Sequence, residues 1–156
     1  MAPQEALTDL FARLGARDPA QWARSQIEEG IPQLARFLFL RQAWKSVVPD
    51  DDSSWIDAQS RVASDQPGGA IAPALRRALA QGIDPVDLTT MVRVMQWQTL
   101  AGLCYFLDDP GTLEPVVKDV AWRLFQVDAQ DRPIAVMGEL HESVLETDPS
   151  GREMRD

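Results

Sequence analysis

The sequence predicts a mostly α-helical fold, a single-domain bundle of about six or seven helices. Three observations favour it. Apolar residues recur with helical spacing through most of the chain, capping residues and prolines precede several such segments, and one long apolar segment near 84–107 suits a central helix. With 156 residues, of which 45% are hydrophobic and 25% charged, the chain is long enough to bury one core.

The first three predicted helices follow from apolar spacing and from end signals. Residues 7–14 place large apolar side chains on one helix face, and Asp18 followed by Pro19 is a typical start for a second helix that reaches Glu29. Between 32 and 48 the apolar residues cover more than one face. This pattern indicates a helix that is surrounded by others.

Two shorter helices are expected next. Ser54 to Asp57 has the spacing of a capping box, which opens a helix toward Ser64, and helical spacing resumes over 71–79. The proline and two glycines at 67–69 predict a loop between them. This loop is too short to link two domains, and the sequence shows no internal repeat.

The strongest helix signal covers 84–107. Asp84 is a capping residue and Pro85 takes the first helical position. Beyond Trp97 the segment is apolar on all sides. We therefore expect the second half of this helix to be buried in the centre of the bundle, where the substitution Leu103→Asp would unfold the protein.

Residues 112–137 fit two interpretations. The apolar spacing from 112 onward is helical, whereas the segments on either side of a polar loop at 128–133 are rich in strand-forming residues. We predict a helix from 112 to about Ala121, followed by a small β-hairpin over 122–137. Because two strands alone are marginal in water, the hairpin must lie on the helices or pair with another chain.

We expect one helical domain over 1–137, followed by a polar acidic segment over 138–156 that is either docked or flexible. The charge is uneven: residues 1–78 carry 10 acidic and 9 basic side chains, whereas 79–156 carry 14 and 6. An acidic surface repels the phosphates of nucleic acids and attracts basic proteins. The charge pattern therefore predicts a protein partner with a basic surface and no nucleic acid.

Apolar runs and cysteine usage predict the compartment. The longest apolar run, Leu100 to Leu107, is less than half of the roughly 20 residues that a bilayer span needs, and the first residues lack the pattern of a secretory signal. The single cysteine, Cys104, lies in that run, so we expect a buried thiol with a raised pKa. These features predict a cytoplasmic protein with no membrane contact.

The one histidine, His141, lies among carboxylates in the C-terminal segment. If 139–146 is helical, Glu142 and Glu146 are one turn apart and share a face. With Asp148 these residues form a candidate site for a divalent metal, although the His-Glu-x-x-His spacing of zinc proteases is absent. We expect no cofactor other than such a metal.

Further candidate binding residues lie where the predicted core ends. Asp108 and Asp109 follow the apolar helix, where a negative charge opposes the helix dipole. They therefore mark either a site or a salt bridge to Arg123 or Arg132. Two tryptophans are expected to be exposed and available for binding: Trp55, just after a helix start, and Trp122, on the hairpin.

The sequence contains no nucleophile motif and no phosphate-binding loop. The leading hypothesis is a non-catalytic protein-protein interaction or regulatory domain that uses its acidic C-terminal half. One alternative is a metal-binding domain or metal-dependent hydrolase centred on His141. Another is a helical domain that binds a small molecule in a pocket lined by Met95, Trp97 and Tyr105. The oligomeric state is left open.

Overall fold

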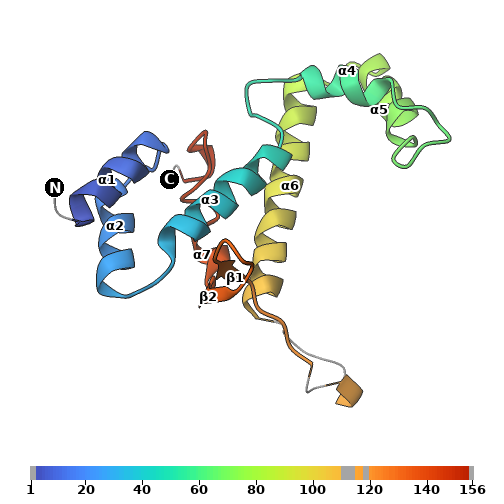
Figure 1. Cartoon of the computed structure of the whole chain (residues 1–156). Helices are drawn as coiled ribbons and strands as arrows, with labels where there is room; N and C mark the ends of the chain where they lie inside the picture. The colour runs from blue at the N-terminus through green and yellow to red at the C-terminus, as the bar shows by residue number, and fades with distance from the viewer. Residues whose placement is uncertain (1–2, 110–114, 118–119, 155–156) are drawn as a thin grey trace. The chain divides into compact units, whose positions relative to one another are not determined.

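The structure, a computed structural model, describes residues 3–109, 115–117 and 120–154 (Figure 1). The protein is mostly helical, as predicted, with one small antiparallel sheet of two strands. The chain forms two compact units, one made of Met1–Trp44 together with Thr99–Asp156 and the other of Lys45–Gln98. The long helix α6, Pro85–Asp108, contributes residues to both.

Three helices form the N-terminal part of the first unit. They are α1 (Pro3–Arg13), α2 (Pro19–Glu28) and α3 (Gln33–Ala43), with a 3-10 turn over Trp44–Ser46 after α3. The predicted cap of α2 is present, because the carboxylate of Asp18 accepts a hydrogen bond from the backbone N–H of Gln21 at 2.9 Å. These helices are confirmed, although α3 ends earlier than the apolar pattern suggested.

Aromatic rings form the core of this part of the unit. Phe11 from α1, Trp22 from α2 and Phe37 from α3 are all buried, and their ring centroids lie 5.3 to 5.8 Å apart. Stacked and edge-to-face pairs of this kind add about 0.5–1.5 kcal/mol each beyond the burial of their area. The rings hold the three helices together.

The C-terminal segment packs into the same unit. Its regular elements in the described residues are α7 (Leu140–Ser143) and a 3-10 turn (Arg152–Met154). Leu140 and Val144 are fully buried, and the indole of Trp44 donates a hydrogen bond to the carbonyl of Val144 at 2.8 Å. Apolar burial and a buried hydrogen bond therefore hold this segment in place.

The second unit contains α4 (Ser54–Ser60), α5 (Ile71–Ala80) and the first part of α6. The capping box predicted from Ser54 to Asp57 is wrong, because Ser54 already lies inside α4. The backbone N–H of Ser54 donates a hydrogen bond to the carboxylate of Asp52 at 2.8 Å. The predicted loop at 67–69 is confirmed. Gly69 is required there, because a Cβ atom would lie 2.2 Å from the carbonyl oxygen of Ala63.

The second half of α6 is not buried on all sides, so that prediction is wrong. Leu100 and Cys104 are buried on one face, whereas Leu103 is 53% exposed and Phe106 58% exposed. The apolar sequence supplies one face that packs within the unit and a second face that remains uncovered. No helix in the described part of the chain is long and apolar enough to cross a membrane.

The helix predicted over 112–121 is also wrong for its described residues. Pro115–Val117 forms only a 3-10 turn, and residues 120–124 have no helical structure; 112–114 and 118–119 lie outside the described residues. Three of the side chains here are valines, whose branching at Cβ lowers helix propensity. The indole of Trp122 instead donates a hydrogen bond to the carbonyl of Phe106 at 2.6 Å, at the end of α6.

The predicted hairpin is confirmed. Strands β1 (Phe125–Val127) and β2 (Pro133–Val136) pair antiparallel, with Phe125 opposite Val136 and an irregularity between Gln126 and Val127. The loop between the strands is closed by the carboxylate of Asp128, which forms an ion pair with Arg132 at 2.7 Å.

Candidate functional site

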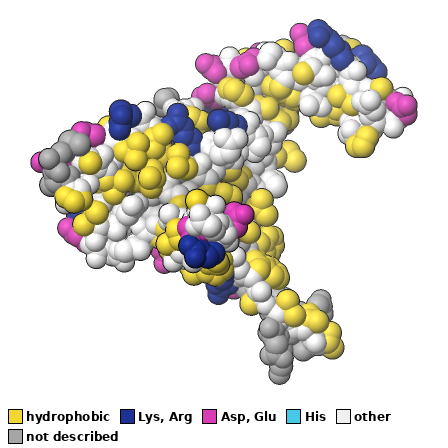
Figure 2. Space-filling view, viewed as in Figure 1, with side chains coloured by type: hydrophobic (Ala, Val, Ile, Leu, Met, Phe, Trp, Pro, Cys, Tyr) yellow, Lys and Arg dark blue, Asp and Glu magenta, His cyan; other side chains and the backbone are white. Residues whose placement is uncertain are grey.

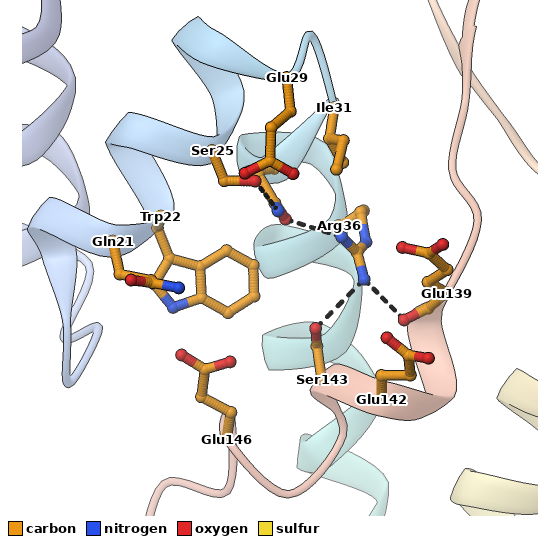
Figure 3. A pocket seen from close by; sticks show the side chains of 11 residues that line it. Gln21, Trp22, Ser25, Glu29, Ile31, Arg36, Glu139, Glu142, Ser143 and Glu146 are labelled. Atoms are coloured by element: carbon orange, nitrogen blue, oxygen red, sulfur yellow. Dashed lines mark hydrogen bonds between the residues drawn. The ribbon is translucent and has the colours of Figure 1, made fainter.

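A pocket of about 210 Å³ opens in the first unit between α2, the start of α3 and the segment around α7 (Figure 3). Its charged residues are four glutamates and one arginine, so its wall has a formal charge of −3, and we call it the acidic pocket. The residues that line it are Gln21, Trp22, Ser25, Glu29, Ile31, Gln33, Arg36, Glu139, Glu142, Ser143 and Glu146.

Arg36, on α3, connects the walls of this pocket. Its side chain is only 3% exposed, and it donates hydrogen bonds to the side chain of Gln33 at 2.9 Å, the carbonyl of Glu139 at 2.6 Å and the hydroxyl of Ser143 at 3.2 Å. Gln33 in turn donates to the hydroxyl of Ser25 on α2 at 2.8 Å. Burial lowers the pKa of Arg36, and the negative charge of the surrounding carboxylates, Glu139 first, opposes this shift. One buried cation therefore links α2, α3 and the C-terminal segment.

The glutamates of the pocket have different environments. Glu146 is half-buried, with its carboxylate near Trp22 (Figure 3). Burial raises the pKa of Glu146, while a hydrogen bond from the Trp22 side chain acts in the opposite direction. Glu29, Glu139 and Glu142 are exposed. Arg36 is the one basic residue in the lining, and Arg17 acts on Glu146 from outside it. The four glutamates therefore leave a negative surplus that suits a cationic group.

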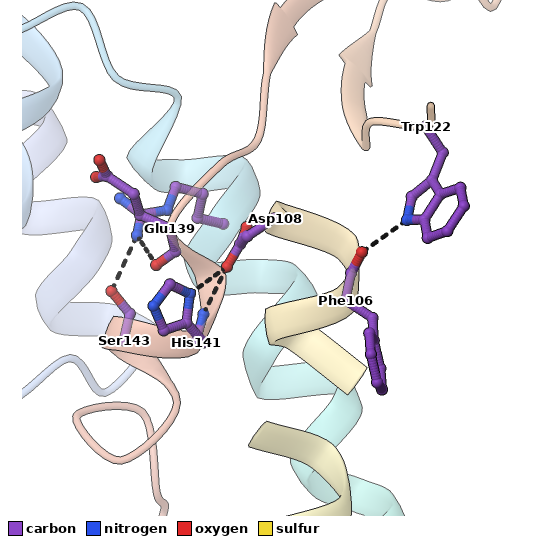
Figure 4. A network of polar contacts seen from close by, with 7 residues as sticks. Phe106, Asp108, Trp122, Glu139, His141 and Ser143 are labelled. Carbon is purple, nitrogen blue, oxygen red and sulfur yellow. Dashed lines mark hydrogen bonds and ion pairs between the residues drawn. The ribbon is translucent and has the colours of Figure 1, made fainter. Parts of the chain in front are cut away.

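Asp108 and His141 form a second polar contact in the first unit (Figure 4). One carboxylate oxygen of Asp108 lies 2.6 Å from Nδ1 of His141 and accepts a hydrogen bond from the backbone N–H of His141 at 3.0 Å. The Asp108 side chain is 7% exposed, and the ring of Tyr105 meets the imidazole edge-to-face at 5.2 Å. The last residue of α6 thus anchors the first turn of α7.

Of the two alternatives given for Asp108, a site or a salt bridge to Arg123 or Arg132, the described residues do not form the salt bridge. Arg132 pairs with Asp128 instead, and Arg123 donates a hydrogen bond to the carbonyl of Trp122 at 2.9 Å. Asp109 is exposed at the end of α6.

The four candidate metal ligands lie in different environments. His141 contacts Asp108, whereas Glu142 and Glu146 line the acidic pocket. Asp148 is 2% exposed, and its carboxylate accepts hydrogen bonds from the backbone N–H groups of Ser150 and Glu153. In the described part of the chain, no three His, Cys, Asp or Glu side chains lie close enough together to hold a metal ion.

The aromatic candidates differ in exposure. Trp55 is half-buried and donates a hydrogen bond to the hydroxyl of Thr89 at 2.9 Å, whereas Trp122 is 44% exposed. Two of the residues predicted to line a small-molecule pocket, Met95 and Tyr105, lie at the surface, with 67% and 49% of their area exposed. Trp122 is therefore the better placed of the two tryptophans for contact with another molecule.

Cys104 has the environment that the sequence predicts. Its side chain is fully buried, and burial, with a smaller effect of the negative charge of Asp108, raises the pKa of Cys104 to about 11. A thiol of this kind is a poor nucleophile at neutral pH.

Sequence reasoning missed the residues that give the pocket its structure. Trp22, Ser25 and Arg36 were not among the predicted site residues, although Arg36 carried a usable signal. An arginine between Leu34 and Phe37 in a helix that is apolar on several faces must find polar partners when it is buried. Two of its three partners, Glu139 and Ser143, come from more than 100 residues away in the sequence.

No family model matches the chain, and neither a curated protein nor a solved structure is significantly similar to it.

Proposed function

We propose that this chain is a cytoplasmic, non-catalytic protein-interaction domain that binds a basic partner through the acidic pocket. The observation that carries the proposal is the surplus of negative charge, because four glutamates from two distant segments line one pocket and Arg36 is the one basic residue in its lining. A lysine or arginine side chain of a partner is the matching group.

The positions of the glutamates support a side chain as the occupant. Glu142 and Glu146 come from the segment around α7, and Glu29 follows α2, so the carboxylates approach the pocket from different sides. A guanidinium group has five donors in a planar fork and can use several separate acceptors at once. The pocket volume of about 210 Å³ leaves room for such a group.

Long-range charge supports the same assignment. Residues 79–156 carry 14 acidic and 6 basic side chains, and this half supplies three of the four glutamates in the pocket. Such a field accelerates the approach of a basic surface, and the acceleration decreases when salt screens it.

A peptide-binding experiment tests the proposal. The probes are two labelled peptides of equal length, one that contains arginine and one in which glutamate replaces each arginine, and binding is followed by fluorescence anisotropy at low and high salt. We expect the full-length chain to bind the arginine peptide and to lose affinity as salt rises. The glutamate peptide should not bind.

Two double variants with the same change in charge locate the binding site. Glu142→Gln with Glu146→Gln removes two charges from the pocket, and we expect it to weaken binding roughly tenfold. Asp51→Asn with Asp65→Asn removes two exposed charges from the second unit and should leave affinity unchanged. Equal affinities of the two double variants, or equal binding of both peptides, would overturn the proposal.

A further inference from the structure

The first unit exposes a second surface that is apolar and that the acidic pocket does not include. Its large side chains are each 40% to 59% exposed. Figure 2 shows apolar side chains along the last turns of α6, where this surface begins. We define the apolar face as Leu103, Phe106, Trp122, Phe125, Val127, Ile134 and Val136.

Hydrogen bonds and strand pairing connect the parts of the apolar face. Leu103 and Phe106 are three residues apart on α6, so they share one side of that helix. The indole of Trp122 donates to the carbonyl of Phe106 at 2.6 Å (Figure 4), and Phe125 lies directly opposite Val136 in the hairpin. The end of α6 and the hairpin thus belong to one local structure.

The exposed area is similar to the apolar part of a standard protein-protein interface. From these exposed fractions and the typical areas of aromatic and aliphatic side chains, the face exposes roughly 350–600 Å² of apolar surface. The largest apolar patch on a typical monomer is about 300–600 Å². A standard interface buries about 800 Å² on each partner, of which a little more than half is apolar.

Local charge identifies a second copy as the matching partner. The chain has a net charge of −9, so two copies repel each other at most surfaces. Residues 120–137, however, carry two arginines and two aspartates, and Asp128 and Arg132 already form an ion pair. The apolar face contains no charged residue. Asp109, at the end of α6, adds one exposed acidic side chain beside the face. The hairpin part of the face is therefore neutral, and two copies can meet there without the repulsion expected of the chain as a whole.

The hairpin also benefits from a second copy. Each of its strands has one edge without a neighbouring strand among the described residues, and a two-stranded sheet with an exposed apolar side is marginally stable in water. Burial of Phe125, Ile134 and Val136 against the same residues of another chain would cover that side.

We propose that the chain forms a two-fold symmetric homodimer in which the apolar faces of two copies pack against each other. In such an interface the same surface serves both partners, which a neutral and apolar surface permits. The proposal does not depend on the acidic pocket binding a basic partner.

Sedimentation velocity and light scattering of the full chain test the dimer. Over concentrations from roughly 1 to 100 µM, the wild-type mass should rise to twice 17.4 kDa. Ile134→Asp places a charge on each side of the interface and should raise the dissociation constant at least tenfold. Val86→Asp is the matched control, because Val86 is 62% exposed, Ile134 is 59% exposed, and Val86 lies outside the apolar face. This control should remain dimeric.

Two further measurements separate the possible causes of a negative result. Circular dichroism checks the fold of each variant, and if Ile134→Asp is unfolded, Ile134→Thr replaces it because threonine retains strand preference. High salt should leave the dimer intact, although it weakens binding of the arginine peptide at the acidic pocket. A wild-type chain that stays monomeric throughout, or a folded Ile134 variant that stays as dimeric as Val86→Asp, would overturn the dimer without affecting the proposed peptide binding.

Discussion

Replacement of Arg36 by methionine keeps a long, flexible side chain but removes the guanidinium that connects α2, α3 and the C-terminal segment. Three hydrogen bonds are lost, to Gln33, Glu139 and Ser143. Gln33 and Ser143 are themselves buried, so the loss of a charged partner is costly even though both line the pocket.

The size of the effect follows from these partners. Hydrogen bonds to a charged group contribute about 1.5–3 kcal/mol each, whereas burial of the cation costs several kcal/mol that the variant recovers. We therefore expect Arg36→Met to lower the free energy of unfolding by about 3 kcal/mol, out of a typical total of about 5–15 kcal/mol. For a chain of this length, that corresponds to a melting temperature lower by roughly 6–12 °C. Arg36→Lys keeps the charge without the planar fork and should lose about half as much.

Thermal unfolding followed by circular dichroism measures the loss, and hydrogen exchange locates it. Amides of residues 139–148 should exchange faster in Arg36→Met, because Arg36 holds that segment through Glu139 and Ser143. Arg24→Met is the control, since Arg24 is exposed on α2 and its loss should cost less than about 0.5 kcal/mol. If Arg36→Met were as stable as Arg24→Met, or if exchange over 139–148 were unchanged, the role assigned to Arg36 would be refuted.

Three further outcomes follow from burial and pKa. Leu140→Ala should lower the free energy of unfolding by about 3–5 kcal/mol because Leu140 is fully buried. Leu103→Asp should lower it by about 1 kcal/mol or less in dilute protein, because Leu103 is half exposed. Urea unfolding compares the two variants, and a larger loss for Leu103→Asp would contradict the exposure of this side of α6. Burial raises the pKa of Glu146, so the folded protein binds the proton of this carboxyl group more tightly than the unfolded chain does. The stability that this tighter binding contributes is lost as pH rises through the raised pKa. Glu146→Gln should therefore be more stable than wild type at about pH 7 but not at about pH 4, and melting curves at both values decide. With its pKa raised to about 11 from 9.0, Cys104 should be alkylated at about pH 8 at least 100-fold more slowly in the native protein than in guanidinium; equal rates would show that the thiol is accessible.

The helices with clear end signals could be predicted from the sequence. Asp18 with Pro19 and Asp84 with Pro85 mark starts that local chemistry alone determines, because a capping carboxylate and a proline in the first turn act on neighbouring residues. The hairpin was predictable for the same reason, since its polar loop separates two segments of strand-forming residues.

The exposed side of α6 could not be predicted. Hydrophobicity shows that Leu103 and Phe106 favour burial, but it does not show whether the covering surface comes from the same chain or from another. The helix expected over 112–121 failed for a related reason. Its described residues contain valines with low helix propensity, and the contact of Trp122 with the end of α6 is tertiary.

The candidate site could be predicted only in part. Glu142 and Glu146 were expected to share a face of a helix over 139–146. The helix α7 ends at Ser143, but both glutamates do line the acidic pocket. Arg36 is separated from Glu139 by 103 residues, and no local pattern shows that such distant segments meet. The pairing of Asp108 with His141 was missed because the two residues are 33 positions apart.

The first unit is built from two stretches of sequence, and this order has a consequence for synthesis on the ribosome. Lys45–Gln98, the second unit, is continuous and can fold as soon as it emerges. The indole of Trp44 and the guanidinium of Arg36 need acceptors that lie 100 and 103 residues further on. At roughly 5–20 residues per second, these acceptors are made about 5–20 s later. During that interval α1, α2 and α3 lack the segment that completes their unit, and this is the period in which a chaperone would bind them.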